Sequence, residues 1–157
     1  MPLLIASHKT PVGTLNLLAD DQILIGANLS TVSAFKAGSD VKVVKSIPVI
    51  SDLIHDYFDG DLLALNGISV RQPGGKFSQN AWKAMRKIPA GKTWSYAELA
   101  KRAGSADAVR AAGTACGNNL IAPIIPCHRI VKSGGALGNY GYGVAIKEWL
   151  LNHEGAL

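Results

Sequence analysis

The feature that most constrains the fold is a break near the middle of the chain, at Arg71-Gln-Pro-Gly-Gly75. Proline and glycine interrupt helix and strand patterns, and the charge balance changes at the same place. Residues 1–72 carry 5 Lys+Arg and 7 Asp+Glu, a net charge of −2, whereas residues 73–157 carry 11 and 4, a net charge of +7. We therefore expect two domains, 1–72 and 73–157. The excess of positive charge fits an anionic partner such as nucleic acid, or simply a solvated basic face.

Composition excludes several classes of protein. With 48% hydrophobic and 17% charged residues, the 157-residue chain is expected to fold rather than stay disordered. Apolar runs stay well short of the roughly 18 residues that span a bilayer, and Met1-Pro-Leu-Leu-Ile5 lacks the basic start of a secretory signal. We expect a cytoplasmic protein without a membrane partner, in which Cys116 and Cys127 are thiols.

The leading domain has the pattern of a small α/β unit. Residues 11–29 contain two apolar runs around Asp20-Asp21, which predicts an antiparallel hairpin. Apolar residues on one face of residues 46–58 predict a helix that Gly60 ends, and Leu62–Val70 is expected to return as a strand.

The trailing domain is predicted to be mainly helical, so that the whole chain is α+β. Phe77–Ile88 fits an amphipathic helix. Ser95 followed by Glu98 reads as a capping box for a helix that ends at Gly104. Ser105 is expected to cap a further helix that runs through Cys116. Two helices joined by a glycine-containing turn outline a helix-turn-helix, which we expect to be winged-helix-like.

The second of these two helices has an unusual composition for a DNA reader. It presents Ala, Val, Gly and Thr with the single Arg110, whereas base-edge readers carry long polar side chains. Small side chains would let its backbone approach a groove closely, with Arg110 entering the base stack. On composition alone, an alanine-rich packing helix is the favoured interpretation.

A reactive cysteine is indicated within the apolar run Ile121–Val131. Cys127, His128 and Arg129 interrupt this run, and Pro126 fixes the approach to the thiol. His128 offers a base or a water relay, and the charge of Arg129 favours the thiolate. Thiolate is the nucleophilic form of cysteine, so this group could carry covalent chemistry.

Simple packing and capping roles account for several other residues with reactive side chains. Cys116 is expected to be an inert residue of helix packing. Glu98 and Asp107 are explained as cap and first-turn residues, which leaves Glu154 as the best partner to orient the histidine, although spacing alone does not separate it from Glu148. The two cysteines lie 11 residues apart with one adjacent histidine, so no metal site is expected.

The motif Pro126-Cys-His-Arg129 resembles the active-site motif of the O6-alkylguanine-DNA alkyltransferases, the methylated-DNA-protein-cysteine methyltransferases. Further segments fall in the order and spacing of that family, and they cover residues 77–155 closely and residues 1–72 only in outline. These segments are Ile88–Ala100, Val109–Ala115, Asn118-Asn119, Gly138-Asn-Tyr140 and Lys147–Gly155.

The resemblance implies roles for five residues in the chemistry. Cys127 would accept the alkyl group, and His128 would take its proton through a water. Glu154 would orient the histidine, and Asn119 would hold the turn between the recognition helix and the site. Tyr96 would donate a proton to the departing guanine.

The resemblance also implies a DNA surface and a base pocket. Arg110 would fill the gap left by a nucleotide turned out of the duplex, and this reading reverses the preference for a packing helix. The other residues against the minor groove would be Ala108, Val109, Gly113 and Thr114. The base pocket would be lined by Tyr140, Ser133 and Pro126.

The implied activity is direct-reversal repair of O6-alkylguanine in double-stranded DNA, in which each molecule reacts once and needs no cofactor. Activity on O4-alkylthymine and cooperative binding on DNA stay open, and a monomer is expected. Two alternatives remain from the residues themselves: a DNA-binding module that senses alkylation without repair, and a Cys-His hydrolase. Tyr142 near the expected pocket edge and Thr114, where many relatives have glycine, depart from the family pattern. The absence of cysteine from residues 1–72 excludes the zinc site of some relatives.

Overall fold

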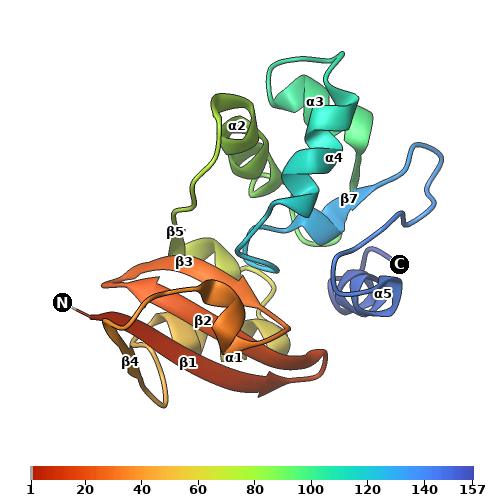
Figure 1. The fold of residues 1–157 in the computed structure, drawn as a ribbon. Helices are drawn as coiled ribbons and strands as arrows, with labels where there is room; N and C mark the ends of the chain where they lie inside the picture. The colour runs from red at the N-terminus through yellow and green to blue at the C-terminus, as the bar shows by residue number, and fades with distance from the viewer. Residues whose placement is uncertain (1) are drawn as a thin grey trace. The chain divides into compact units, whose positions relative to one another are not determined.

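The computed structural model describes residues 2–157. The chain divides into two compact units between Gln72 and Pro73. Within the described residues there are five α-helices and one five-stranded sheet, so the predicted α+β class is confirmed (Figure 1). None of these helices is long and apolar enough to cross a membrane.

The first unit is built on the five-stranded sheet, whose order is β4-β1-β2-β3-β5. The predicted hairpin is confirmed as the antiparallel pair of β2 and β3, and a further strand, β1, pairs antiparallel with β2. The two edge strands are short and parallel to their neighbours. The strands are β1 (Leu3–Thr10), β2 (Gly13–Asp20), β3 (Ile23–Asn28), β4 (Val41–Val43) and β5 (Ser69–Val70).

The predicted helix of this unit forms as α1 (Ile50–Phe58), which begins later than residue 46 because Pro48 and Val49 make a tight turn before it. The predicted strand Leu62–Val70 is mostly wrong. Its first part is the 3-10 helix η2 (Ala64–Gly67), held by i to i+3 hydrogen bonds, and only the last two residues pair as β5. A second 3-10 helix, η1 (Val32–Phe35), follows β3.

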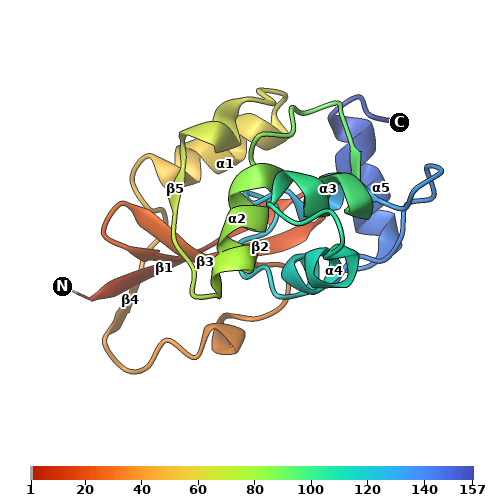
Figure 2. The same ribbon diagram turned by 90° about the horizontal axis from the view of Figure 1, so that it is seen from above.

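The second unit is mainly helical, and α2, α3 and α4 pack against one another (Figure 2). Trp82 on α2 ties this cluster together, because its Nε1 donates to the carbonyl of Ala115 on α4 at 2.9 Å. The elements are α2 (Lys76–Met85), β6 (Trp94–Ser95), α3 (Tyr96–Arg102), α4 (Val109–Gly117), the 3-10 helix η3 (Cys127–Arg129), β7 (Ile130–Val131) and α5 (Val144–His153).

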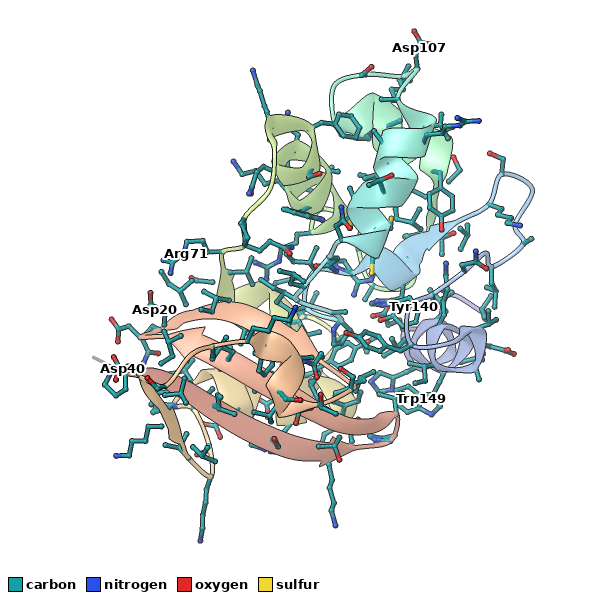
Figure 3. The ribbon with its side chains drawn as sticks, in the orientation of Figure 1. Asp20, Asp40, Arg71, Asp107, Tyr140 and Trp149 are labelled. Carbon is teal, nitrogen blue, oxygen red and sulfur yellow. The ribbon has the colours of Figure 1, made fainter. Side chains whose placement is uncertain are left out.

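Of the two helices expected to form the helix-turn-helix, α3 begins where the sequence predicted and α4 begins later. The Ser95 cap of α3 is confirmed, since its Oγ accepts from the backbone N–H of Glu98 at 3.0 Å. The start of α4 was predicted too early. Ser105 belongs to a turn in which its carbonyl accepts from the N–H of Ala108, so the helix begins only at Val109. Asp107 stands at the tip of this turn (Figure 3).

Candidate active site

The reactive motif lies in a stretch that is buried throughout, residues 121–131. Its apolar residues fill the core, and the motif itself makes the single turn η3, in which the N–H of Arg129 donates to the carbonyl of Pro126 at 3.0 Å. β7 follows at once and pairs in parallel with β6. This packing gives the three polar residues of the motif a fixed backbone.

Cys127 lines a pocket of about 470 Å³. The residue is 8% exposed. Gly113 and Gly117 of α4 line the pocket, together with Tyr96, the first residue of α3, and Tyr140. Glycine backbone, aromatic side chains and the thiol therefore border the same hollow, as a pocket for a flat ring would require.

Asn119 holds the turn that leads from α4 to the cysteine. Its Oδ1 accepts from the N–H of Ile121 at 3.1 Å, and its Nδ2 donates to the carbonyl of Ile125 at 2.8 Å. The same Nδ2 lies 3.4 Å from the Sγ of Cys127 and donates to it. The predicted bracing residue therefore also contacts the sulfur directly.

A buried chain of hydrogen bonds lies next to Cys127 in the sequence. His128 is 0% exposed, and its Nε2 lies 2.9 Å from Oε2 of Glu154. Arg129 grips the same carboxylate with two bonds of 2.9 Å, from Nε to Oε1 and from Nη2 to Oε2. The Nη1 of Arg129 donates to the carbonyl of Ile88 at 2.6 Å. Glu154 is thus held from two sides, and Glu148 on the exposed face of α5 is not part of this network.

The protonation states in this network follow from burial and partners. Burial alone would raise the pKa of Glu154, but the bonds and charges of His128 and Arg129 together lower it well below its usual value. Burial lowers the pKa of His128, and its bond to Glu154 offsets this only partly. The neutral histidine donates from Nε2 to the carboxylate, which leaves its Nδ1 as an acceptor. That Nδ1 is buried and has no hydrogen-bond partner among the described residues.

The charge that favours the thiolate of Cys127 comes from an unexpected residue. Burial raises the pKa of Cys127, while the hydrogen bond from Asn119 and the charge of Lys147 lower it. Arg129, expected to supply this charge, is instead engaged by Glu154 and Ile88, so that expectation was wrong. Two opposed effects therefore act on the thiol, and burial is the larger.

Lys147 is the functional candidate that sequence reasoning missed. It is 0% exposed, and its Nζ donates to the carbonyls of Ile130 at 2.6 Å and of Asn139 at 3.2 Å. A lysine in a helix is ordinarily assigned to the surface. The available signal was its spacing, because Lys147, Leu150, Leu151 and Glu154 form one buried face of α5 and its C-cap.

The residues expected in the base pocket are placed differently from one another. Tyr140, which lies shortly before α5 in Figure 3, lines the pocket. Its ring lies edge to face with the ring of His128, with 6.5 Å between the ring centroids. Pro126 is buried and does not line the pocket, and Ser133 is exposed in the turn after β7, whereas Lys132 takes a lining position. Tyr140 also contacts the ring of Tyr142 at 5.7 Å.

Burial also sets the protonation states of Tyr96 and Cys116, which line the pocket. Burial raises the pKa of Tyr96, followed by the effects of Cys116 and Cys127, which keeps the phenol protonated as a donor. Cys116 was expected to be an inert packing residue. It lines the pocket instead, but burial raises its pKa to about 12, so that it stays a thiol.

The residues expected on the DNA surface lie along one side of α4. Ala112 and Ala115 are buried, while Val109, Arg110 and Thr114 are exposed. Ala112 and Ala115 therefore pack as the packing interpretation expects, while the exposed side of the helix stays a predicted DNA surface. Ala108 is the N-cap residue and is half-buried, and Gly113 faces the pocket.

Comparison with known proteins places this geometry in a family. The family model described as "6-O-methylguanine DNA methyltransferase, DNA binding domain" matches residues 76–156. The chain is 33% identical over 159 residues to the methylated-DNA--protein-cysteine methyltransferase of Shigella flexneri, covering 94% of this chain and 93% of the relative. It is also 33% identical to the protein of the same name from Methanosarcina acetivorans, over 96% of this chain and 97% of the relative.

Solved structures agree with the sequence matches. The crystal structure of Mycobacterium tuberculosis OGT in complex with DNA superimposes with a TM-score of 0.84 at 30% identity, covering 98% of this chain and 93% of the other. That of the M. tuberculosis O6-methylguanine methyltransferase gives a TM-score of 0.83 over the same shares. Since the family model spans more than half of the chain and full-length relatives exceed 30% identity, this chain belongs to the 6-O-methylguanine DNA methyltransferase family.

Proposed function

We propose that this chain repairs O6-alkylguanine in double-stranded DNA by moving the alkyl group onto Cys127, once per molecule. The observation that carries the proposal is the position of Cys127, whose thiol opens into the pocket while His128 and Glu154 are buried beside it in the same core. Membership of the family and the DNA complex of the M. tuberculosis relative support DNA as the partner.

In the first step the thiol loses its proton to His128. The buried Nδ1 has no partner among the described residues, so it is the acceptor that a water between it and the sulfur would use. Glu154, fixed by Arg129, keeps the other ring nitrogen protonated and stabilises the imidazolium that forms. Asn119 and Lys147 stabilise the negative charge that remains on the sulfur.

In the second step the thiolate attacks the alkyl carbon in line with its bond to O6. The new S–C bond forms as the C–O6 bond breaks, and the bonding electrons move into the guanine ring. Tyr96 donates its phenolic proton to that ring and recovers a proton from solvent, while the imidazolium of His128 releases to solvent the proton it took from the thiol. The product is a thioether, which no side chain of the pocket can cleave, and the balance needs no cofactor.

The duplex would be held by α4, the second helix of a winged-helix-like helix-turn-helix. Guanine O6 lies inside the stack, so the nucleotide has to be turned out to reach a thiol that is 8% exposed. The small exposed side of α4 would lie in the minor groove, with Arg110 in the gap in the stack. One copy of the chain supplies every group in this scheme, so we propose that it acts as a monomer.

Intact-mass measurement after mixing the protein with a duplex that contains one O6-methylguanine tests this function. We expect a gain equal to one methylene unit, one per molecule, located on Cys127 by peptide mapping. Cys116→Ser is the matched control, because it removes the other thiol of the same pocket, and it should still gain the mass, whereas Cys127→Ser should not.

The other outcomes contradict the proposal in distinguishable ways. Release of many repaired duplexes per molecule without a mass change would indicate a Cys-His hydrolase-like enzyme. Tight binding of the damaged duplex with no mass change and no repair would indicate a module that recognises damage without repairing it.

A further inference from the structure

A second hollow lies on the basic unit, away from Cys127. It is a groove of about 610 Å³ between the C-terminal part of α2 and the last turn of α3. It shares no lining residue with the pocket of Cys127. Figure 2 shows α2 and α3 lying side by side. Residues of both helices line this groove. The proposed repair chemistry leaves the groove without a role.

Three cations line the groove: Lys83 on α2, Lys87 in the turn after α2, and Arg102 at the end of α3. Lys83 and Lys87 stand on the α2 side, and both are exposed. Within residues 2–157 neither lysine has a carboxylate partner. Asn80 adds a polar side chain on the same rim, donating from Nδ2 to the carbonyl of Ala103 at 3.4 Å. This rim therefore presents the positive charge of two lysines, about one helical turn apart, at the end of α2 and in the turn that follows it.

The opposite rim holds its cation in a defined place. The guanidinium of Arg102 lies over the ring of Trp94, 5.0 Å from the ring centroid, and its Nε donates to Oε1 of Glu98 at 2.8 Å. Within the described part of the chain, no other protein acceptor engages its terminal nitrogens. Planar guanidinium groups bind phosphate oxygens through such terminal nitrogens. Arg102 is thus pre-positioned for an anion in the groove, with Glu98 offsetting part of its charge.

We propose that this groove binds the phosphodiester backbone of the same DNA, beyond the base pairs that contact α4. Gly104, which lines the groove, begins the turn that joins α3 to α4, so the groove lies on elements that neighbour the proposed DNA-binding helix in the same unit. The net charge of +7 on residues 73–157 suits a polyanion. The inference rests on the proposed function for its partner, but it concerns a separate surface of the unit.

The test is the salt dependence of DNA binding by the full-length chain. Each phosphate contact contributes a slope of about 0.9 to the fall of log K with log salt concentration. Lys83→Gln combined with Lys87→Gln should therefore lower the slope by about 2 on a long undamaged duplex. It should leave unchanged both the slope on a duplex just long enough to cover α4 and the alkylation of Cys127 by free O6-methylguanine base.

Lys101→Gln is the matched control, because Lys101 is an exposed lysine of α3 outside the groove. It should change the slope on the long duplex by less than half of the effect of the double variant. An equal effect per charge, or an unchanged slope in the double variant, would overturn the proposal. So would binding of an oligoglutamate peptide that competes with DNA and is lost in the double variant, because the groove would then be a protein-docking site. Failure of the wild-type protein to alkylate would refute the proposed function separately.

Discussion

Replacing the buried Lys147 with methionine tests the origin of the reactivity of Cys127. Methionine has similar length but removes the charge that lowers the pKa of Cys127. An opposite charge close to a titrating group shifts its pKa by roughly 1–3. We expect a pKa shift at the lower end of this range, because the ammonium of Lys147 also donates to the carbonyls of Ile130 and Asn139, whose dipoles partly offset its charge. A rise of about 1 lowers the thiolate fraction at neutral pH by about tenfold.

The assay is the rate of Cys127 alkylation across pH, measured with iodoacetamide in a Cys116→Ser background. Burial holds the pKa of the thiol above its usual value, so the rate should rise with pH through the neutral range. In the Lys147→Met variant the whole profile should move to higher pH and approach the wild-type rate at its alkaline end. Lys132→Met is the control, since Lys132 lines the pocket but is exposed. An unmoved midpoint, or an equal loss of rate at every pH, would refute the electrostatic role.

Three further changes probe the network and the scaffold. Glu154→Gln leaves Arg129 buried without a full counter-charge, so it should lower the free energy of unfolding in urea by about 3 kcal/mol. The same variant should slow repair without changing DNA affinity. A loss of DNA affinity would mark Glu154 as purely structural. Gly74→Ala would place a Cβ 2.6 Å from the ring of Trp82, so we expect the free energy of unfolding to fall by about 1–3 kcal/mol. An unchanged free energy of unfolding would show that the ring can move. The pKa of His8 is lowered by burial, so the free energy of unfolding should fall as the pH drops below 6.5, the value for the unfolded state. The fall should be at most about 1.4 kcal/mol per pH unit. A His8→Gln variant whose free energy of unfolding falls equally steeply with pH would contradict this.

The parts of the fold that sequence could predict are those governed by local rules. The Ser95 cap appears as expected, and the amphipathic helix predicted at Phe77–Ile88 forms as α2, because capping and apolar periodicity act within a few residues. The start of α4 was placed too early, since Ser105 has the same chemistry in a turn as in a cap. The strand expected at Leu62–Val70 became mostly a 3-10 helix, because short apolar runs do not distinguish these states.

The site was predicted only in part: Cys127, His128, Glu154 and Asn119 are brought together, whereas Lys147 was missed and Pro126 and Ser133 do not line the pocket. His128 and Glu154 meet as expected, yet the choice of Glu154 over Glu148 needed the helix face that only packing reveals. Adjacency in sequence suggested that Arg129 acts on Cys127, but side chains that follow one another in a tight turn point to different partners. Lys147, 20 positions away, acts instead, and no local pattern links the two residues.

Burial of the sulfur has a consequence for the resting protein. A molecule that is consumed by a single reaction gains nothing from a thiol that is permanently ionised, since peroxides and soluble electrophiles attack the anion. Because Cys127 is almost enclosed and its pKa is raised, the unbound protein holds its sulfur in the sluggish, protonated form. The apolar packing that shapes the pocket therefore also protects the unreacted sulfur from oxidation and from soluble electrophiles.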